Sequence, residues 1–218
     1  MLIFKTCYGK IFMCGHSSVG RASASQVEGR GFKSRWPLHQ ALLGGYFFKK
    51  VIKMQTIEAI KRRRSVRKYI DKPIKNEILK DIVDCGRLAP SGNNSQPWEF
   101  LVVTKHEDLD FLAKVTTYGK FLKEAGACII TFCEKNNRHH LEDGSAATEN
   151  MILAATDYGI GTCWIAGYNR TYEEDIVSHF NVPQDLRMIS IISLGYDDSH
   201  PYVPNKRSID EVLHWEKF

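Results

Sequence analysis

Eight consecutive residues, Arg62-Arg63-Arg64-Ser65-Val66-Arg67-Lys68-Tyr69, include side chains suited to binding an anion. If residues 65–69 are extended, Arg63, Ser65 and Arg67 lie on one side, because side chains alternate along a strand. Two guanidinium groups with a hydroxyl between them suit a phosphate, which arginine binds through two parallel hydrogen bonds. The pattern predicts a phosphate site, and a solvated basic helix end is the alternative interpretation.

A second segment, Ala89-Pro90-Ser91-Gly92-Asn93-Asn94-Ser95-Gln96-Pro97-Trp98, concentrates hydrogen-bonding groups on a backbone stiffened by two prolines. Such a loop suits a planar ligand with a polar edge, although a plain polar turn explains it equally when it is considered alone. Two further stretches could line a ligand. They are the basic Pro204-Asn205-Lys206-Arg207 and the glycine-containing turn from Gly159 to Gly167, where close backbone approach is possible.

Several common sites are absent from the sequence. No Gly-x-Gly-x-x-Gly joins a strand to a helix, no P-loop occurs, and no Gly-x-Ser-x-Gly marks a serine hydrolase. The group His139, His140, Glu142 and Asp143 matches no usual metal-ligand spacing, and the six cysteines contain no Cys-x-x-Cys pair. We therefore expect no metal site.

Residues 54–218, called the body below, alternate between helix-like and strand-like patterns. Periodicity predicts helices at 55–64, 76–88, 108–115, 141–158, 171–180 and from 208 onward. Apolar runs predict strands at 99–104, 127–133 and 188–194, buried on both faces, and a short strand or turn at 161–166. Capping boxes are expected at Thr171-x-x-Glu174 and Ser208-x-x-Glu211, and Gly159 is expected to end the longest helix. This alternation predicts one α/β or α+β domain.

Charge is distributed unevenly along the 218 residues. Residues 1–53 contain nine Lys or Arg and one acidic residue, whereas the body contains 21 basic and 24 acidic residues. Nothing in the body therefore favours nucleic-acid binding. No apolar run approaches the roughly 20 residues of a membrane span, and no secretory signal is recognisable. We expect a cytoplasmic protein in which Cys128 and Cys163 are small core residues.

The first 53 residues form a basic head without sustained periodicity, which we do not expect to be a domain. Its stretches from His16 to Ala22 and from Gly31 to Leu38 resemble the translation of a transfer-RNA gene. We therefore expect translation to begin at Met54, and a basic disordered tail that touches anionic surfaces is the alternative. The intact mass of the natively expressed protein decides between them.

The body resembles the nitroreductase family of FMN-dependent oxidoreductases over about residues 54–218. The resemblance rests on motifs in a fixed order: Arg63-Arg64-Ser65-Val66-Arg67, Ala89 to Trp98, Glu149-Asn150-Met151, Gly159 to Trp164, Ser193-Leu194-Gly195-Tyr196 and Lys206-Arg207. It implies a three-layer αβα sandwich that forms an intertwined homodimer. Two FMN molecules then lie at the subunit interface, and each contacts both chains.

The resemblance also implies which residues bind FMN. The phosphate and ribityl chain are assigned to Arg63, Arg64, Ser65 and Arg67, together with Lys206 and Arg207. The loop that lines the isoalloxazine ring from the partner subunit is assigned to Pro90, Ser91, Asn94 and Gln96. The backbone beside flavin N5 is assigned to Ala166 and Gly167, where some members carry Glu-Gly. This chain therefore brings no N5-side carboxylate.

The implied activity is hydride transfer from NADH or NADPH through FMN to a nitroaromatic, a quinone or a similar electron-poor acceptor, by ping-pong turnover. The residue expected to act electrostatically is Arg67, near the pyrimidine edge of the flavin. Two alternatives stay open: a non-catalytic flavin-binding or redox-sensing protein, and a specialised family member with another acceptor. The residues determine neither the physiological acceptor nor the choice between NADH and NADPH.

Overall fold

The computed structural model describes residues 56–199 and 201–218, so the head at 1–53 and the expected start at Met54 lie outside the described residues. Four strands form one sheet in the order β1-β2-β4-β3, and every neighbouring pair is antiparallel. The strands are β1 (Trp98–Val103), β2 (Ala127–Glu134), β3 (Gly161–Ala166) and β4 (Leu186–Gly195). Strands β2 and β4 are almost completely buried, as expected for central strands covered on both faces.

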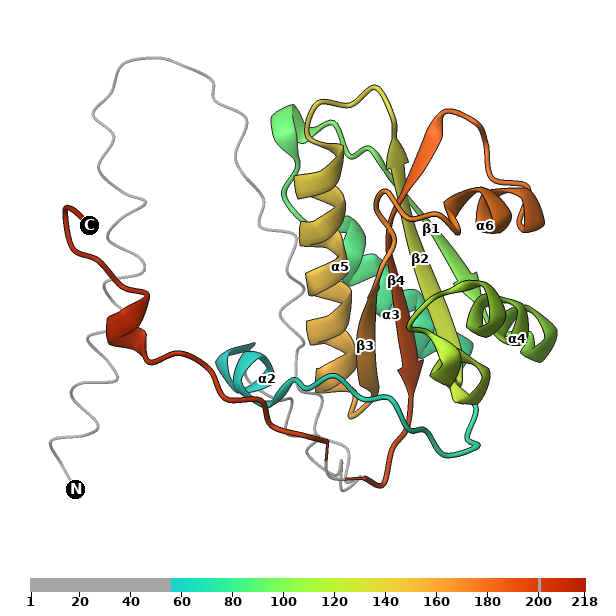
Figure 1. Ribbon diagram of the computed structural model, residues 1–218, viewed down its shortest axis with the longest axis horizontal. Coiled ribbons are helices and arrows are strands. Elements are labelled where there is room, and N and C mark those ends of the chain that lie inside the picture. Colours follow the sequence, from blue (N-terminus) through green and yellow to red (C-terminus); the bar gives the residue numbers. More distant parts are fainter. Residues whose placement is uncertain (1–55, 200) are drawn as a thin grey trace, which may run out of the picture. The chain divides into compact units, whose positions relative to one another are not determined.

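Helices cover both faces of this sheet and create three layers (Figure 1). The helices are α2 (Thr56–Arg62), α3 (Asn76–Arg87), α4 (His106–Val115), α5 (His140–Asp157) and α6 (Glu173–His179). One hydrophobic cluster joins α3 and α5 to β2 and β4, and another joins α4 and α6 to the same two strands. The αβα layering expected from the sequence is therefore present in the chain.

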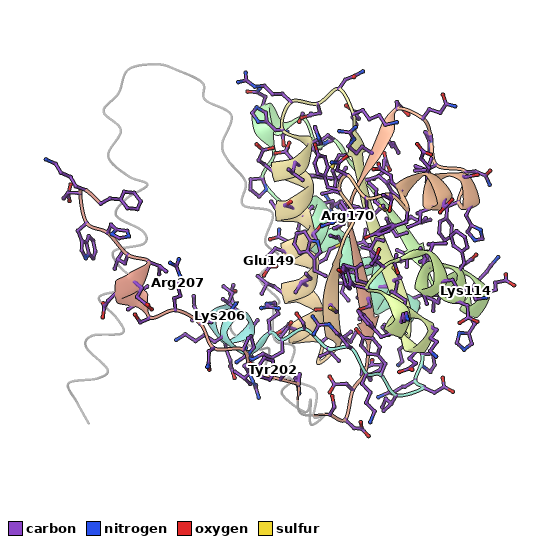
Figure 2. All side chains as sticks on the ribbon, viewed as in Figure 1. Lys114, Glu149, Arg170, Tyr202, Lys206 and Arg207 are labelled. Atoms are coloured by element: carbon purple, nitrogen blue, oxygen red, sulfur yellow. The ribbon has the colours of Figure 1, made fainter. Side chains whose placement is uncertain are left out.

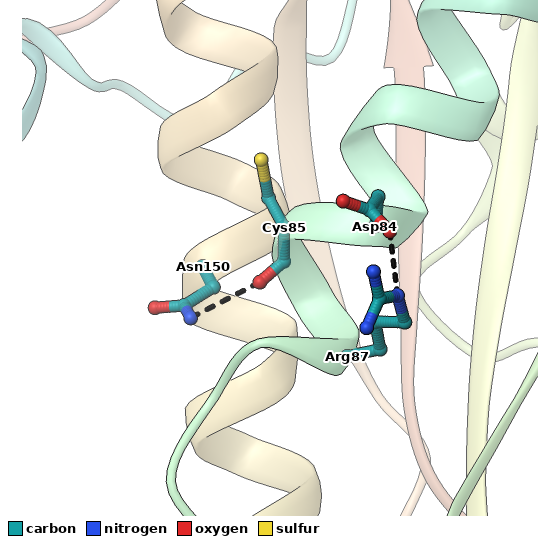
Figure 3. Close-up of polar contacts among 4 residues, drawn as sticks. All are labelled: Asp84, Cys85, Arg87 and Asn150. Atoms are coloured by element: carbon teal, nitrogen blue, oxygen red, sulfur yellow. Dashed lines mark hydrogen bonds and ion pairs between the residues drawn. The ribbon is translucent and has the colours of Figure 1, made fainter. Parts of the chain in front are cut away.

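Helix α5 is tied to α3 at the point where the 89–98 loop begins. The side-chain amide of Asn150 donates to the Cys85 carbonyl at 3.2 Å, and Arg87 pairs with Asp84 within α3 at 2.5 Å (Figure 3). Helix α5 ends as expected, because Gly159 adopts the left-handed conformation with φ of 68°. After Gly159 the polypeptide reverses direction and enters β3.

Two capping expectations had different outcomes. The Thr171-Glu174 box was wrong: α6 begins at Glu173, and Tyr172 precedes it without a side-chain cap. The Tyr172 ring packs into the core there, which delays the helix start. The Ser208-Glu211 box does form, but it opens only a single 3₁₀ turn, η3 (Ile209–Glu211), instead of a longer helix.

The described residues contain no group of three metal-ligating side chains and no helix long and apolar enough to cross a membrane. Cys128 and Cys163 are buried, as predicted. Two short 3₁₀ turns, η1 (Gly92–Asn94) and η2 (Lys120–Glu124), complete the elements that surround the candidate site.

Candidate active site

The segment from Arg63 to Tyr69 runs across the ends of β3 and β4. Val66 N–H donates to the Thr162 carbonyl at 2.8 Å, and Ser65 forms a parallel bridge with Thr162. The buried Tyr69 hydroxyl contacts the Val66 carbonyl at 2.8 Å and the Ser193 hydroxyl at 2.6 Å. This segment is therefore fixed to β3 at Ser65 and Val66 and to β4 at Tyr69.

Two glycines let this segment approach the sheet. A Cβ atom at Gly161 would come within 2.8 Å of Val66 Cγ2, and one at Gly195 would come within 2.5 Å of Tyr69 Cδ1. Any larger residue would push the segment away from the strands. Both glycines belong to motifs that the family resemblance used, and this close packing is their physical role.

The side chains of Ser65 and Arg67 lie beside the Cys163 thiol on β3, and the charge of Arg63 reaches it. Burial raises the pKa of this thiol, and the Arg67 charge is the largest opposing influence. Hydrogen bonds from Ser65 and Arg67 and the charge of Arg63 also lower the Cys163 pKa. The predicted anion-binding side chains are therefore close together in the folded chain.

Arg64 is placed differently from its neighbours. Its guanidinium group donates to the Lys61 carbonyl at 2.7 Å and to the Arg63 carbonyl at 2.8 Å. These contacts satisfy carbonyl groups at the end of α2, which have no partner within the helix. In this structure Arg64 completes the helix end, while Ser65 and Arg67 lie beside Cys163.

A cavity of about 160 Å³ adjoins Arg67 and Cys163. Its lining also includes Ala166, so it joins the predicted anion-binding element to the predicted ring-binding backbone. Several lining residues were missed by sequence reasoning: Thr117, Tyr118, Phe121, Arg170 and Tyr172. The aromatic-rich stretch around Tyr118 was the available signal, but only the fold shows that it faces β3.

The backbone at Ala166 and Gly167 is held by three contacts. The Tyr172 hydroxyl donates to the Ala166 carbonyl, and Tyr168 N–H donates to the Ile189 carbonyl at 3.0 Å. Gly167 itself lies so close to β4 that a Cβ would come within 2.8 Å of Ser190 N. Gly167 is buried, yet none of the residues described accepts a hydrogen bond from its N–H. A bound ligand can supply that acceptor.

The 89–98 loop is anchored at the other end of α5. Gly92 N–H lies 3.1 and 3.2 Å from the two carboxylate oxygens of Asp143, which is buried. Within the loop, Gln96 N–H donates to the Ser91 hydroxyl at 3.0 Å. Asp143 was considered only as a poor metal ligand from the sequence. Its role in the structure is to fix this loop.

Backbone strain is concentrated in the same loop. Asn93, Asn94 and Gln96 have φ values of 54°, 56° and 50°, in the left-handed region that non-glycine residues rarely adopt. Asparagine tolerates this conformation better than most residues, whereas glutamine does not share that preference. Strained residues of this kind persist where surrounding contacts hold them, and they cluster at ligand-binding sites.

The twelve predicted site residues do not all meet within one chain. The loop that carries Pro90, Ser91, Asn94 and Gln96 is attached at Asp143, whereas Arg63 lines a groove with Thr156 near the other end of α5. Thirteen residues of helix separate these two points, which is roughly 20 Å. Lys206 and Arg207 lie on the exposed C-terminal segment (Figure 2), where no described residue forms an ion pair with them.

Comparison with known proteins identifies the family. The family described as "Nitroreductase family" matches residues 60–127 and 112–196. A Methanothermobacter thermautotrophicus protein, provisionally named NADH dehydrogenase/NAD(P)H nitroreductase, is 36% identical over 174 residues, covering 78% of this chain and 91% of the relative.

Two solved structures share the fold. An FMN-dependent nitroreductase from Clostridium difficile is 34% identical with a TM-score of 0.69, covering 74% of this chain and 99% of that one. A provisionally named nitroreductase from Desulfovibrio desulfuricans, solved in complex with FMN, is 29% identical with a TM-score of 0.67 and coverages of 75% and 97%. These matches show that the chain belongs to the nitroreductase family of oxidoreductases.

Proposed function

We propose that this protein is a cytoplasmic FMN-dependent oxidoreductase that passes electrons from NADH or NADPH to a small electron-poor acceptor, such as a nitroaromatic or a quinone. The position of Arg67 in one cavity with the Ala166 backbone, beside the Cys163 thiol, is the observation that carries this proposal. It supplies a phosphate site and a ring-binding edge within one continuous region. Family membership supports the redox chemistry.

The residues present fit FMN in charge and in hydrogen bonding. Neither Arg63 nor Arg67 forms an ion pair with a carboxylate in the described part of the chain, although the Arg63 charge opposes the burial that raises the Glu149 pKa. Both guanidinium groups therefore keep donors for a phosphate. The Gly167 N–H lacks an acceptor among the same residues, and a heteroaromatic ring edge offers one. An anionic group with a polar planar ring satisfies both needs.

The protein's contribution is to bind and to orient. When bound, FMN supplies the hydride and electron chemistry. Arg63 and Ser65 hold its phosphate and ribityl chain, and Arg67 places positive charge where negative charge develops on reduction, which favours the reduced form. No carboxylate lies at position 166, so the chain adds no acid there.

We further propose that the complete site requires a homodimer. The 89–98 loop is held away from Arg63 by the length of α5. Lys206 and Arg207 lie on a segment whose large apolar side chains are exposed, including Tyr202, Trp215 and Phe218. A second copy of the chain can bury these side chains and bring its own loop to the first copy's Arg63, Ser65 and Arg67.

Anaerobic reduction tests the activity. NADH or NADPH should bleach the flavin absorbance of the purified protein, and a nitroaromatic or quinone should restore it. If the bound flavin resists both nicotinamides, a non-catalytic flavin-binding role replaces the proposal. If the flavin is reduced but neither acceptor restores the absorbance, the acceptor class is wrong.

Mixed dimers test the composite site. Arg67→Ala weakens the anion-binding element by one charge-assisted contact, and Gln96→Trp places a bulky side chain on the loop surface. Each variant alone should bind little FMN, whereas dimers co-expressed with two tags should recover about half of the wild-type FMN, because one of two sites is intact. Mixed dimers that bind no more than either variant would assign both elements to a site within one chain.

A further inference from the structure

Tyr172 combines a buried ring with a hydroxyl that contacts the candidate site. The ring belongs to the hydrophobic cluster that includes Ile165, Ile176 and Met188, and only 7% of the residue is exposed. Burial raises the Tyr172 pKa, with Arg170 opposing the shift, so the phenol stays protonated at neutral pH. The hydroxyl is therefore a hydrogen-bond donor, and its acceptor is the Ala166 carbonyl.

The contact fixes one particular peptide unit. In a trans peptide the C=O and the following N–H point in opposite directions, so a held Ala166 carbonyl also fixes the direction of the Gly167 N–H. The close approach of Gly167 to Ser190 and the Tyr168–Ile189 hydrogen bond prevent the chain from rotating elsewhere. The Gly167 N–H is thus a preoriented donor without an acceptor among the residues that the structure describes.

We propose that Tyr172 is a positioning residue that aims the Gly167 N–H at the N5 atom of the bound flavin. This inference rests on the proposed function, which assigns the Ala166–Gly167 backbone to the N5 edge. In the oxidised flavin N5 has a lone pair that accepts a hydrogen bond, and after reduction N5 carries a hydrogen of its own. A donor fixed here stabilises bound oxidised FMN more than bound reduced FMN.

The variant Tyr172→Phe tests this role because it keeps the buried ring and removes only the hydroxyl. Oxidised FMN should bind about tenfold more weakly, the effect of one hydrogen bond, while reduced FMN binds nearly unchanged. That difference converts to a bound-flavin potential about 30 mV more positive. In the ligand-free full chain, the amide resonance of Gly167 should also shift.

Tyr158→Phe is the matched control. Tyr158 likewise donates its hydroxyl, to Asp81 at 2.6 Å, but it is distant from Gly167 and more exposed. It should leave both the potential and the Gly167 resonance unchanged.

The outcomes separate this inference from the proposed function. Wild-type protein that binds FMN, together with a Tyr172→Phe variant whose potential equals the wild-type value, overturns the role of Tyr172 alone. An equal loss of affinity for oxidised and reduced FMN also overturns it, because that result indicates general loosening. Wild-type protein that cannot bind FMN overturns the proposed function and this inference together.

Discussion

Two basic segments of this protein differ sharply in how the chain supports them. The segment Arg63–Tyr69 is held by backbone hydrogen bonds, by the buried Tyr69–Ser193 contact and by close packing against two glycines. In the segment 201–218, which carries Lys206 and Arg207, all residues from 202 onward are exposed, and its capping box bonds only within itself. The proposed function assigns both segments to the same phosphate. If that proposal is correct, one half of the site is prefolded and the other half awaits a second surface.

The C-terminal segment exposes apolar side chains that a second surface could bury. Tyr202 is 80% exposed, Trp215 is 78% exposed, and none of the segment's residues belongs to a core cluster. Contiguous exposed apolar side chains mark interaction surfaces. We therefore expect substitutions in the segment Arg63–Tyr69 to change the folding stability of the chain. Substitutions in the segment 201–218 should change only dimer formation and FMN affinity.

Deletion of residues 201–218 should cause the largest loss of FMN affinity and should leave the folded sheet intact. Far-ultraviolet circular dichroism should stay close to wild type, because the core clusters exclude these residues. FMN affinity should fall at least about 100-fold, since two charge-assisted contacts of about 1.5–3 kcal/mol each are lost. Unchanged affinity would remove the segment from the site.

Arg67→Ala should have the next largest effect. Loss of one charge-assisted contact weakens FMN binding by roughly 10- to 150-fold. Fluorescence titration measures the affinity, and dye equilibration should show a more negative flavin potential because positive charge near the ring is lost. Lys114→Ala, an exposed charge on α4, is the control and should change neither quantity.

Matched tyrosine variants compare the two segments directly. Tyr69→Phe leaves the buried Val66 carbonyl without its donor, while the Ser193 hydroxyl keeps only the Cys163 carbonyl, so the free energy of unfolding should fall by about 1–3 kcal/mol. Tyr202→Phe, the same change on an exposed residue, should leave stability within about 0.5 kcal/mol of wild type. If urea denaturation showed equal losses of unfolding free energy for the two variants, the distinction between the segments would be wrong.

Ser208→Ala should have the smallest effect. It removes a capping box from the single turn η3, where Ser208 N–H donates to the Glu211 carboxylate at 2.7 Å and the Ser208 hydroxyl donates at 3.0 Å. The free energy of global unfolding should change by less than about 0.5 kcal/mol, because no core residue packs against this turn. Hydrogen exchange should instead increase locally around Glu211. A measurable loss of global stability would show that the segment is part of the core.

The main elements could be predicted from the sequence because their signals are local. The apolar runs of β2 and β4, the periodicity of α5 and the glycine at 159 each depend on neighbouring residues. The resemblance then supplied the order of the motifs. It also placed Arg63, Ser65 and Arg67 in one element, and the structure brings Ser65 and Arg67 beside Cys163.

The supporting contacts could not be predicted because their partners are distant in the sequence. Gly92 meets Asp143 across 51 residues, and Tyr69 meets Ser193 across 124. The failed capping box at Thr171 has the same origin, since packing of Tyr172 into the core outweighs a local cap. Local patterns indicate which residues can bind a ligand, whereas tertiary packing decides which residues hold them in place.

The proposal that this protein is a flavoprotein is tested most directly by titrating the purified full-length protein with FMN and recording its visible spectrum. We expect saturable binding of about one FMN per chain, with the absorption bands of a bound flavin. A colourless protein that does not take up FMN under these conditions would contradict it.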